Sequence, residues 1–152
     1  MKKILERWKK YAKKNEDRNY YFIRSLKMKA PRPVDKLAKE LHEEAFQKID
    51  CTNCANCCKT ISPLVTEKDS RRIARHFNMG VDEFKTQYLE KDREGDWLIK
   101  GLPCPFLGED DKCTIYDVRP KDCREYPHAN KKGFARRSHG HTANTLVCPA
   151  VF

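Results

Sequence analysis

Long apolar stretches are missing from this sequence. No hydrophobic run approaches the ~20 consecutive residues that a membrane-spanning helix requires. The first ten residues have the basic start of a secretory signal, but Glu6, Arg7 and Lys9 interrupt the apolar segment that should follow it. We therefore expect a cytoplasmic protein without a membrane partner.

Glycine-rich loops and familiar catalytic motifs are missing too. The six glycines are scattered along the chain, so there is no glycine-rich loop to hold a phosphate. There is also no serine nucleophile elbow, no HExxH helix and no CxxxCxxC run of the kind that radical enzymes use. The sequence thus leaves open whether the protein is an enzyme, and it predicts no catalytic residue.

Apolar residues are few for a chain of this size. Hydrophobic residues make up 39% and charged residues 36% of the 152 positions. We expect a single domain of ordinary size with a thin core. Bonds to a metal could supply the missing stability, as they do in other small cysteine-rich domains.

Cysteine, in contrast, is abundant. The eight cysteines include a compact CxxCxxCC run at residues 51–58, and thiolates are the ligands that soft metals and iron–sulfur clusters prefer. Structural disulfides are rare in the reducing cytosol, so we favour metal ligation over a disulfide framework. The predicted metal ligands are Cys51, Cys54, Cys57, Cys58, Cys104, Cys113, Cys123 and Cys148.

The spacing of the cysteines leaves two cofactors open, Zn²⁺ and an iron–sulfur cluster. Cys51, Cys54 and Cys57 have the spacing of the three adjacent ligands in cubane clusters, which often take a fourth ligand from a Cys-Pro pair. Both Cys104 and Cys148 precede a proline. A structural zinc site would more usually show two separate CxxC knuckles, so the spacing tilts slightly toward iron–sulfur.

Cys58 complicates a single site. Neighbouring side chains in extended backbone point to opposite sides, so we expect Cys57 and Cys58 to serve different sites, unless Cys58 is a spare redox thiol. Eight sulfurs divide naturally into two groups of four. We therefore favour two sites or one compact dinuclear site.

A second informative segment surrounds Cys123, at residues 113–127. Arg119 and Arg124 flank this cysteine, and a guanidinium near a thiolate lowers its pKa and can donate hydrogen bonds to sulfur. We favour such a role for Arg124 and have no preference for Arg119, which could instead face solvent.

The pattern of apolar residues predicts a helix-rich α+β domain with a short antiparallel hairpin and metal-binding cysteine loops. We divide it into a basic helical extension, residues 1–33, and a cysteine-cluster domain, residues 34–152. Expected helices cover residues 2–14 and 34–49 and begin at Thr66 and Asp82; expected strands lie at 97–99 and near 145–147, with a turn at 109–112.

The net charge of +10 raises a second class of partner. Lysines and arginines crowd residues 2–14, where they alternate with Trp8 and Tyr11, and residues 131–137. Such stretches suit nucleic-acid phosphates, but they equally suit a solvated surface. The metal ion is the expected partner, nucleic acid is a less favoured one, and no protein partner is predicted.

Taken together, the motifs resemble the YkgJ-like cysteine-cluster family of zinc- or iron-chelating domains. The resemblance rests on CxxCxxCC at 51–58, Pro-Cys-Pro-Phe-Leu at 103–107 and the segment 113–127, and it covers roughly residues 50–148. It implies metal binding by all eight cysteines but no cellular role. A larger member of the group, flagellin lysine N-methylase, uses S-adenosylmethionine; we do not transfer that activity to a short chain without a nucleotide loop.

Three functions follow as hypotheses. The favoured one is a metal-chelating domain. The alternatives are an iron–sulfur electron-transfer protein or enzyme subunit, and a nucleic-acid-binding module stapled by zinc.

Overall fold

The chain forms two compact units in the computed structural model, which describes residues 2–152. We call Met1–Cys54 together with Pro127–Phe152 the helical unit, and Ala55–Tyr126 the central unit. Whether residues 1–33 form an extension separate from residues 34–152 stays a prediction. Across residues 2–152 we find no helix with both the length and the apolar composition of a membrane span.

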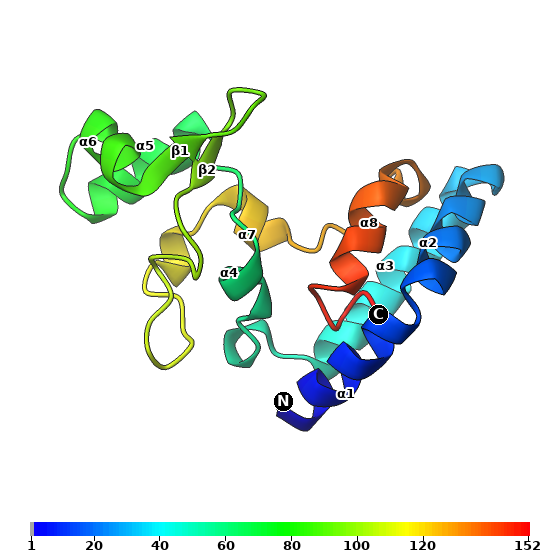
Figure 1. Ribbon diagram of the computed structural model, residues 1–152. Coiled ribbons are helices and arrows are strands. Elements are labelled where there is room, and N and C mark those ends of the chain that lie inside the picture. The colour runs from blue at the N-terminus through cyan, green and yellow to red at the C-terminus, as the bar shows by residue number, and fades with distance from the viewer. Residues whose placement is uncertain (1) are drawn as a thin grey trace. The chain divides into compact units, whose positions relative to one another are not determined.

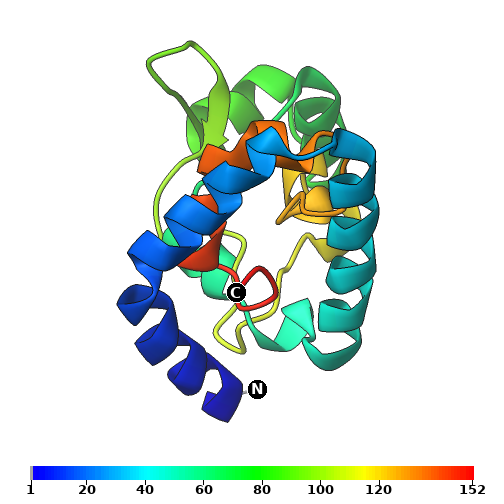
Figure 2. The same cartoon turned by 90° about the vertical axis from the view of Figure 1, so that its right-hand side faces the viewer.

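The helical unit joins the two ends of the chain. α2 packs against α8, and α3 packs against the short 3-10 helix η4, so segments far apart in sequence lie side by side (Figures 1 and 2). The predicted helices at 2–14 and 34–49 are confirmed. The elements are α1 (Lys2–Lys14), α2 (Glu16–Ser25), η1 (Leu26–Met28), α3 (Pro31–Lys48), η2 (Cys51–Asn53), η4 (Phe134–Arg137) and α8 (Ser138–Thr145).

α3 begins three residues earlier than predicted. Pro31 occupies its first turn, where the missing amide proton costs nothing and the fixed φ favours the helix. Asp35 then accepts hydrogen bonds from the backbone amides of Gly133 and Phe134, at 2.8 and 2.9 Å. These bonds attach the start of α3 to the C-terminal segment.

The core of the helical unit is small. Trp8 and Ile23 are each 5% exposed, and the indole Nε1 of Trp8 donates a 3.0 Å hydrogen bond to the carbonyl of Thr145. Leu37 and Leu41 of α3 are each 55% exposed and add little to this core. The other buried residues are Ala12, Pro127, Ala129, Ala135, Ser138, His141, Thr145 and Cys148, most of them small or polar.

The predicted strand near 145–147 is wrong, because Thr145 ends the helix α8. Glycine and threonine give residues 138–145 low intrinsic helix propensity. The helix is stabilised instead by tertiary contacts: Trp8 bonds to Thr145, and the ring of His141 stacks on Phe134 with centroids 4.1 Å apart.

The central unit contains the two-stranded antiparallel sheet of the protein. β1 pairs with β2, and Leu89 lies opposite Ile99. The predicted strand at 97–99 is confirmed, and so is the helix-rich α+β class. The elements are α4 (Asn56–Thr60), α5 (Glu67–His76), α6 (Val81–Tyr88), β1 (Leu89–Lys91), β2 (Trp97–Ile99), η3 (Tyr116–Val118) and α7 (Lys121–Glu125).

α5 starts where the sequence predicts, at a reciprocal cap. The hydroxyl of Thr66 accepts a bond from the amide of Asp69, and the carboxylate of Asp69 accepts one from the amide of Thr66. Two of the orphan donors at the helix start are thereby satisfied. Further along α5, Ile73 and Ala74 are buried in the core of the unit.

The core of the central unit is one continuous apolar cluster, beside which the polar residues Asp69 and Ser70 are also buried. Phe84 and Ile73 are completely buried, and the half-buried side chains of Cys104 and Cys113 pack against the same cluster. Its buried members are Val65, Ile73, Ala74, Phe84, Leu89, Ile99, Phe106 and Ile115. Two of the predicted metal ligands are therefore anchored to the best-packed part of the chain.

Candidate metal centre

The eight cysteines fall into two groups, one in each unit. All eight lie within the described residues, and none forms a disulfide. The CxxCxxCC run is divided after Cys54. The helical unit contains Cys51, Cys54 and Cys148, and the central unit contains Cys57, Cys58, Cys104, Cys113 and Cys123.

In the helical unit, Asp50 organises the turn that carries Cys51 and Cys54. Its carboxylate accepts bonds from the amide of Thr52 at 2.9 Å, the hydroxyl of Thr52 at 2.6 Å and the side-chain amide of Asn53 at 2.5 Å. The amide of Cys54 then donates to the carbonyl of Cys51 at 3.2 Å. The small polar residues between the cysteines thus form a 3-10 turn, where the sequence predicted an open loop.

Cys148 completes this group from the other end of the chain. Its amide donates to the carbonyl of Asn144 at 2.7 Å, which extends the end of α8, and its side chain is buried. Burial raises the pKa of Cys148 to about 12, with further contributions from the charges of Cys51 and Cys54. The three thiols are therefore near enough to influence each other electrostatically.

In the central unit, Cys57 and Cys58 lie side by side on α4. Ala55 adopts a left-handed backbone with φ of 50°, and the helix begins directly after it. The two sulfurs are 4.0 Å apart. Extended backbone was the premise for assigning them to different sites, and it is wrong here because the residues are helical.

A backbone bond connects α4 to the next cysteine. The amide of Cys104 donates to the carbonyl of Cys58 at 2.8 Å. The turn that leads to Cys113 is tied to the same helix, because Lys59 forms an ion pair with Asp111 at 2.5 Å. That turn matches the one predicted at 109–112, and it closes with a single bridge between Leu107 and Cys113.

Cys123 is positioned through α5. The buried carboxylate of Asp69 accepts bonds from the guanidinium of Arg72 at 2.5 Å and from the backbone amide of Lys121 at 3.1 Å, at the start of α7. Asp122 in turn accepts a bond from the amide of Leu64 at 3.1 Å. The sequence predicted a helix that begins at Thr66, but it gave no sign that Asp69 in its first turn also positions the helix with Cys123.

The thiols of the central unit differ in how readily they ionise. A hydrogen bond from Cys57 lowers the pKa of Cys58 to about 7, against the opposing effect of burial. Burial raises the pKa of Cys104 to about 11 and that of Cys123 to about 12, and it raises the pKa of Cys113 as well. Charges on Cys58 contribute to all three increases.

Of the two arginines that flank Cys123, Arg119 affects a different cysteine. Its guanidinium lies 3.6 Å from the centre of the Tyr116 ring and donates to the carbonyl of Tyr116 at 2.5 Å. From there its charge lowers the pKa of Cys113, although burial outweighs it. Arg124 is exposed on α7, and its effect on Cys123 stays a prediction.

The histidine pair at 139 and 141 is divided between surface and core. His139 is exposed, whereas His141 is 2% exposed and stacks on Phe134. Burial lowers the pKa of His141 to about 4, and the nearby charges of Arg137 and His128 act in the same direction. His141 is therefore a neutral core residue.

The thiols of each unit are not arranged around one common point. Within residues 2–152, no three Cys, His, Asp or Glu side chains meet at the distances of a metal site. The donor chemistry nevertheless fits a soft metal. Two thiolates at 2.3 Å from a tetrahedral zinc lie about 3.8 Å apart, close to the 4.0 Å between Cys57 and Cys58.

Comparison with known proteins gives a relative of this chain. A relative from Methanocaldococcus jannaschii, named as an uncharacterized protein, is 35% identical over 82 residues, which cover 52% of this chain and 44% of the relative. The chain thus matches less than half the length of that relative. No solved structure matches the chain, and the likeness to flagellin lysine N-methylase stays a prediction.

The family profile described as "CxxCxxCC: Putative zinc- or iron-chelating domain" matches residues 50–148. That range contains all eight cysteines and about two thirds of the chain. The protein belongs to this CxxCxxCC family of zinc- or iron-chelating domains.

Proposed function

We propose that the protein chelates zinc or iron through its eight cysteines, in two groups that match its two units. The observation that supports this proposal is the distribution of the thiols. Three belong to the helical unit and five to the central unit, and charges on thiols of the same unit raise the pKa of Cys148 and of Cys123. The proposed ligands are Cys51, Cys54 and Cys148 in the first group, and Cys57, Cys58, Cys104, Cys113 and Cys123 in the second.

The ionisation of the thiols supports this proposal. Cys58, with a pKa of about 7, is partly a thiolate at neutral pH and is the natural first ligand of the central group. Cys104 and Cys123 stay protonated without a metal, because a thiolate buried in their surroundings would lack a compensating charge. Metal binding would release their protons and couple ligation to the stability of the unit.

Electron transfer by an iron–sulfur cluster is the alternative that the cysteine spacing favours. It depends on Cys51, Cys54 and Cys57 acting as adjacent ligands. A zinc-stapled nucleic-acid-binding module is the other alternative, and it depends on the basic residues and not on the choice of metal.

The first test identifies the metal. The protein is purified without oxygen, its visible spectrum is recorded, and zinc, iron and acid-labile sulfide are measured per chain. A colourless protein with bound zinc or iron and no sulfide supports simple chelation. A broad band near ~400 nm with matched iron and sulfide supports the cluster, and reversible bleaching on reduction supports electron transfer. A metal-free protein that remains folded would contradict all of these functions.

The second test separates the two groups. Cys104→Ser removes a ligand from the central unit, and Cys148→Ser removes one from the helical unit. We expect each variant to lose only the metal of its own unit, measured by elemental analysis. Loss of all metal in either variant would show one shared site, and full retention would refute the ligand assignment. Arg71→Ala, at an exposed position of α5, is the control and should retain all metal.

A further inference from the structure

The helical unit carries the whole basic excess of the chain. It contains 19 Lys and Arg residues against 8 Asp and Glu, a formal net charge of +11, whereas the central unit has 13 against 14, a net charge of −1. A field of this size attracts polyanions and raises their rate of association. A surface that binds a polyanion is therefore expected on the helical unit.

Cations and aromatic rings recur at helical spacing along α1 and α2. Tyr11 and Lys14 follow Arg7 by steps of four and three residues, Arg18 follows Lys14 by four, and Tyr21 and Phe22 lie three and four residues after Arg18, the spacing that keeps side chains on one side of a helix. Hydrogen bonds from the amide of Asn15 to Tyr11 and from that of Asn19 to Asn15 continue the helical pattern across the junction. We call this face the α1–α2 band: Arg7, Tyr11, Lys14, Arg18, Tyr21 and Phe22.

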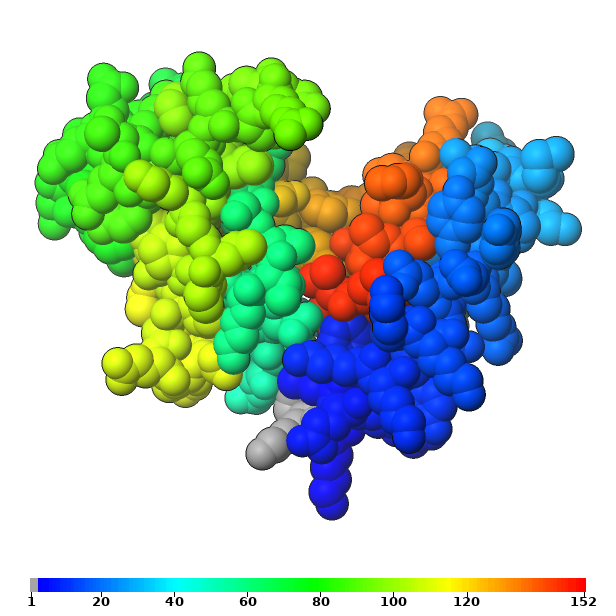
Figure 3. Space-filling model, viewed as in Figure 1, coloured from blue at the N-terminus to red at the C-terminus, as the bar shows by residue number. Residues whose placement is uncertain are grey.

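The rings of the α1–α2 band are open to solvent. Tyr21 is 70% exposed, Phe22 63% and Tyr11 41%. Figure 3 shows α1 and α2, in dark to mid blue, at the surface of the helical unit. Arg7 lies over the ring of Tyr11, 5.9 Å from its centre, so a cation already accompanies one ring.

Cations outnumber acids on the α1–α2 band. Asp17 is exposed three residues after Lys14 and four before Tyr21, so by the same spacing it is the acid that shares this face. Glu16 is paired with Lys13 at 2.6 Å. An exposed row of three cations and three rings against one acid has the two components that single-stranded nucleic acids bind, phosphate neutralisation and base stacking.

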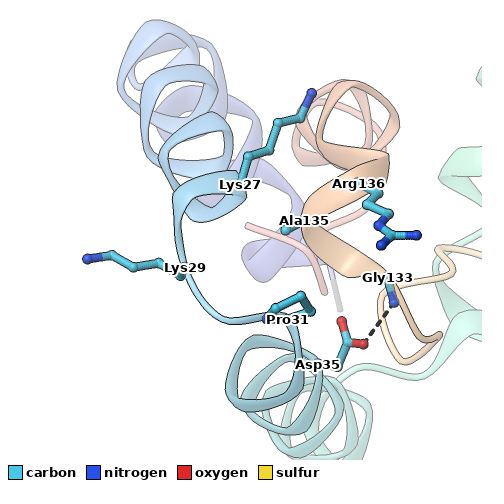
Figure 4. Close-up of a pocket in the computed structure, with 7 residues that line it drawn as sticks. All are labelled: Lys27, Lys29, Pro31, Asp35, Gly133, Ala135 and Arg136. Carbon is cyan, nitrogen blue, oxygen red and sulfur yellow. Dashed lines mark hydrogen bonds between the residues drawn. The ribbon is translucent and has the colours of Figure 1, made fainter.

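The basic surface continues at the end of α2. A pocket of about 430 Å³ lies between η1, the start of α3 and η4, and Lys27, Lys29 and Arg136 are among its lining residues. Asp35 also lines it, but its carboxylate accepts a bond from the amide of Gly133 (Figure 4) and another from the amide of Phe134. The side chains of Lys27 and Lys29 extend outward in the same view.

The geometry points to single-stranded nucleic acid as the ligand of the α1–α2 band, with phosphates on Arg7, Lys14 and Arg18 and bases stacked on Tyr21 and Phe22. An anionic membrane is the less suitable partner. A membrane-bound amphipathic helix inserts a continuous apolar face, and the apolar face of these helices, with Trp8 and Ile23, is already buried in the unit.

Fluorescence anisotropy of labelled oligonucleotides tests this proposal on the metal-loaded full chain. RNA and DNA single strands of about 12 nucleotides, within the site sizes of single-strand binders, are compared with the same sequences as duplexes at roughly 50 and 200 mM salt. We expect the single strands to bind more tightly than the duplexes, and binding to weaken steeply with salt. RNA-only binding and equal binding of RNA and DNA both support the proposal; the comparison shows which backbone is preferred.

Two double variants separate charge from stacking. Tyr21→Ala with Phe22→Ala should weaken binding roughly tenfold or more at each salt concentration and leave the salt slope unchanged. Arg7→Gln with Arg18→Gln should reduce the slope of log K against log salt by about 1.4, or about 0.7 for each lost phosphate contact. All four positions are exposed, so the melting temperature should not change.

Matched controls use the same chemistry at other positions. Lys68→Gln with Arg93→Gln removes two exposed charges from the central unit, and Leu37→Ala with Leu41→Ala removes two exposed apolar side chains from α3. Both should bind like the wild type. The proposal is overturned by absence of binding at low salt, by preference for duplexes, or by controls as damaging as the band variants. Wild-type affinity of the Tyr21/Phe22 variant would overturn it too, as would tighter binding to vesicles of equal phosphatidylcholine and phosphatidylserine.

Discussion

The central unit and the helical unit are built on different interiors. In the central unit, Phe84 and Ile73 are completely buried and belong to one continuous apolar cluster. In the helical unit, the large apolar side chains that are buried are Trp8 and Ile23, and the other buried residues are mostly alanines and polar residues such as His141. The helical unit therefore has less apolar burial to offset the conformational entropy of folding.

Charge enlarges the contrast between the units. The formal net charge of +11 on the helical unit causes self-repulsion, whereas the central unit is close to neutral at −1. Metal binding and screening by salt should thus matter more for the helical unit. The comparison teaches that the two groups of cysteines lie on units that differ in apolar burial and in net charge.

Metal removal should give the largest difference in stability between the two units. Each unit contains one of the two tryptophans, Trp8 and Trp97, so Trp97→Phe and Trp8→Phe leave a fluorescence reporter in one unit at a time. After chelation we expect the helical unit to unfold at a lower urea concentration than the central unit. Structural zinc contributes on the order of 10 kcal/mol in small domains, so the shift should be large. Coincident transitions of the two reporters would contradict this order.

Asp69 is the polar residue on which the central unit depends most. Its carboxylate is 1% exposed and accepts bonds from Thr66, Arg72 and the amide of Lys121. Asp69→Asn removes the charge opposite Arg72 and turns an amide toward donors, so we expect a loss of about 3 kcal/mol in the free energy of unfolding. Urea denaturation followed at Trp97 measures it.

Asp82→Asn is the matched control for Asp69→Asn. Asp82 lies at the exposed start of α6, where loss of a carboxylate should cost less than about 1 kcal/mol. Equal losses in the two variants would show that the network around Asp69 is not special. Because Asp69 also holds the start of α7, its variant should in addition weaken metal binding by the central group.

His141 should make the helical unit sensitive to acid. Its pKa is about 4 in the folded protein, below the ordinary value of 6.5, so the unfolded chain binds the proton first as the pH falls. The stability from neutral His141 is complete above pH 6.5 and decreases toward pH 4, by about 3 kcal/mol over the window.

The variant His141→Phe tests this pH dependence. A phenyl ring preserves the stack on Phe134 and cannot be protonated, so the loss of stability between pH 6.5 and 4 should be smaller than in the wild type. Measuring the difference between the two proteins, with Trp8 as reporter, cancels the effect of acid on the metal. Identical pH profiles would refute the assignment.

Substitutions at the starts of α5 and α2 should give the smallest difference in stability between the two units. Thr66→Ala removes the reciprocal cap of α5 and should cost about 1 kcal/mol. Asn15 precedes α2 in the helical unit, but its side chain donates to the carbonyl of Tyr11 and makes no capping bond. Asn15→Ala should therefore cost less, and thermal melts of the two variants compare them directly.

Elements of the fold were predictable from the sequence wherever the residues that determine an element lie within the element itself. The cap at Thr66 and Asp69 marks the start of α5, and the apolar spacing marks α1 and α3. Segments stabilised by distant partners were not predictable. Residues 138–145 read as irregular because their helix depends on Trp8, more than a hundred residues away.

The candidate site shows the same limit. The sequence predicts all eight cysteines as metal ligands, because their density is typical of metal binding, and that assignment stays a prediction. It misjudged Cys57 and Cys58, since the left-handed turn at Ala55 that starts their helix depends on no recognisable motif. Spacing along the chain also could not show that Trp8, which stands among the cations of residues 2–14, bonds to Thr145 at the other end of the sequence.

By itself, the sequence determined the chemistry of this protein: eight thiols, their family pattern and a strongly basic composition, all of which are properties of residue type and spacing. The tertiary structure alone decided how those residues are shared. It assigned three thiols and the basic excess to one unit and five thiols to the other, because burial and long-range hydrogen bonds, not spacing along the chain, determine which side chains become neighbours.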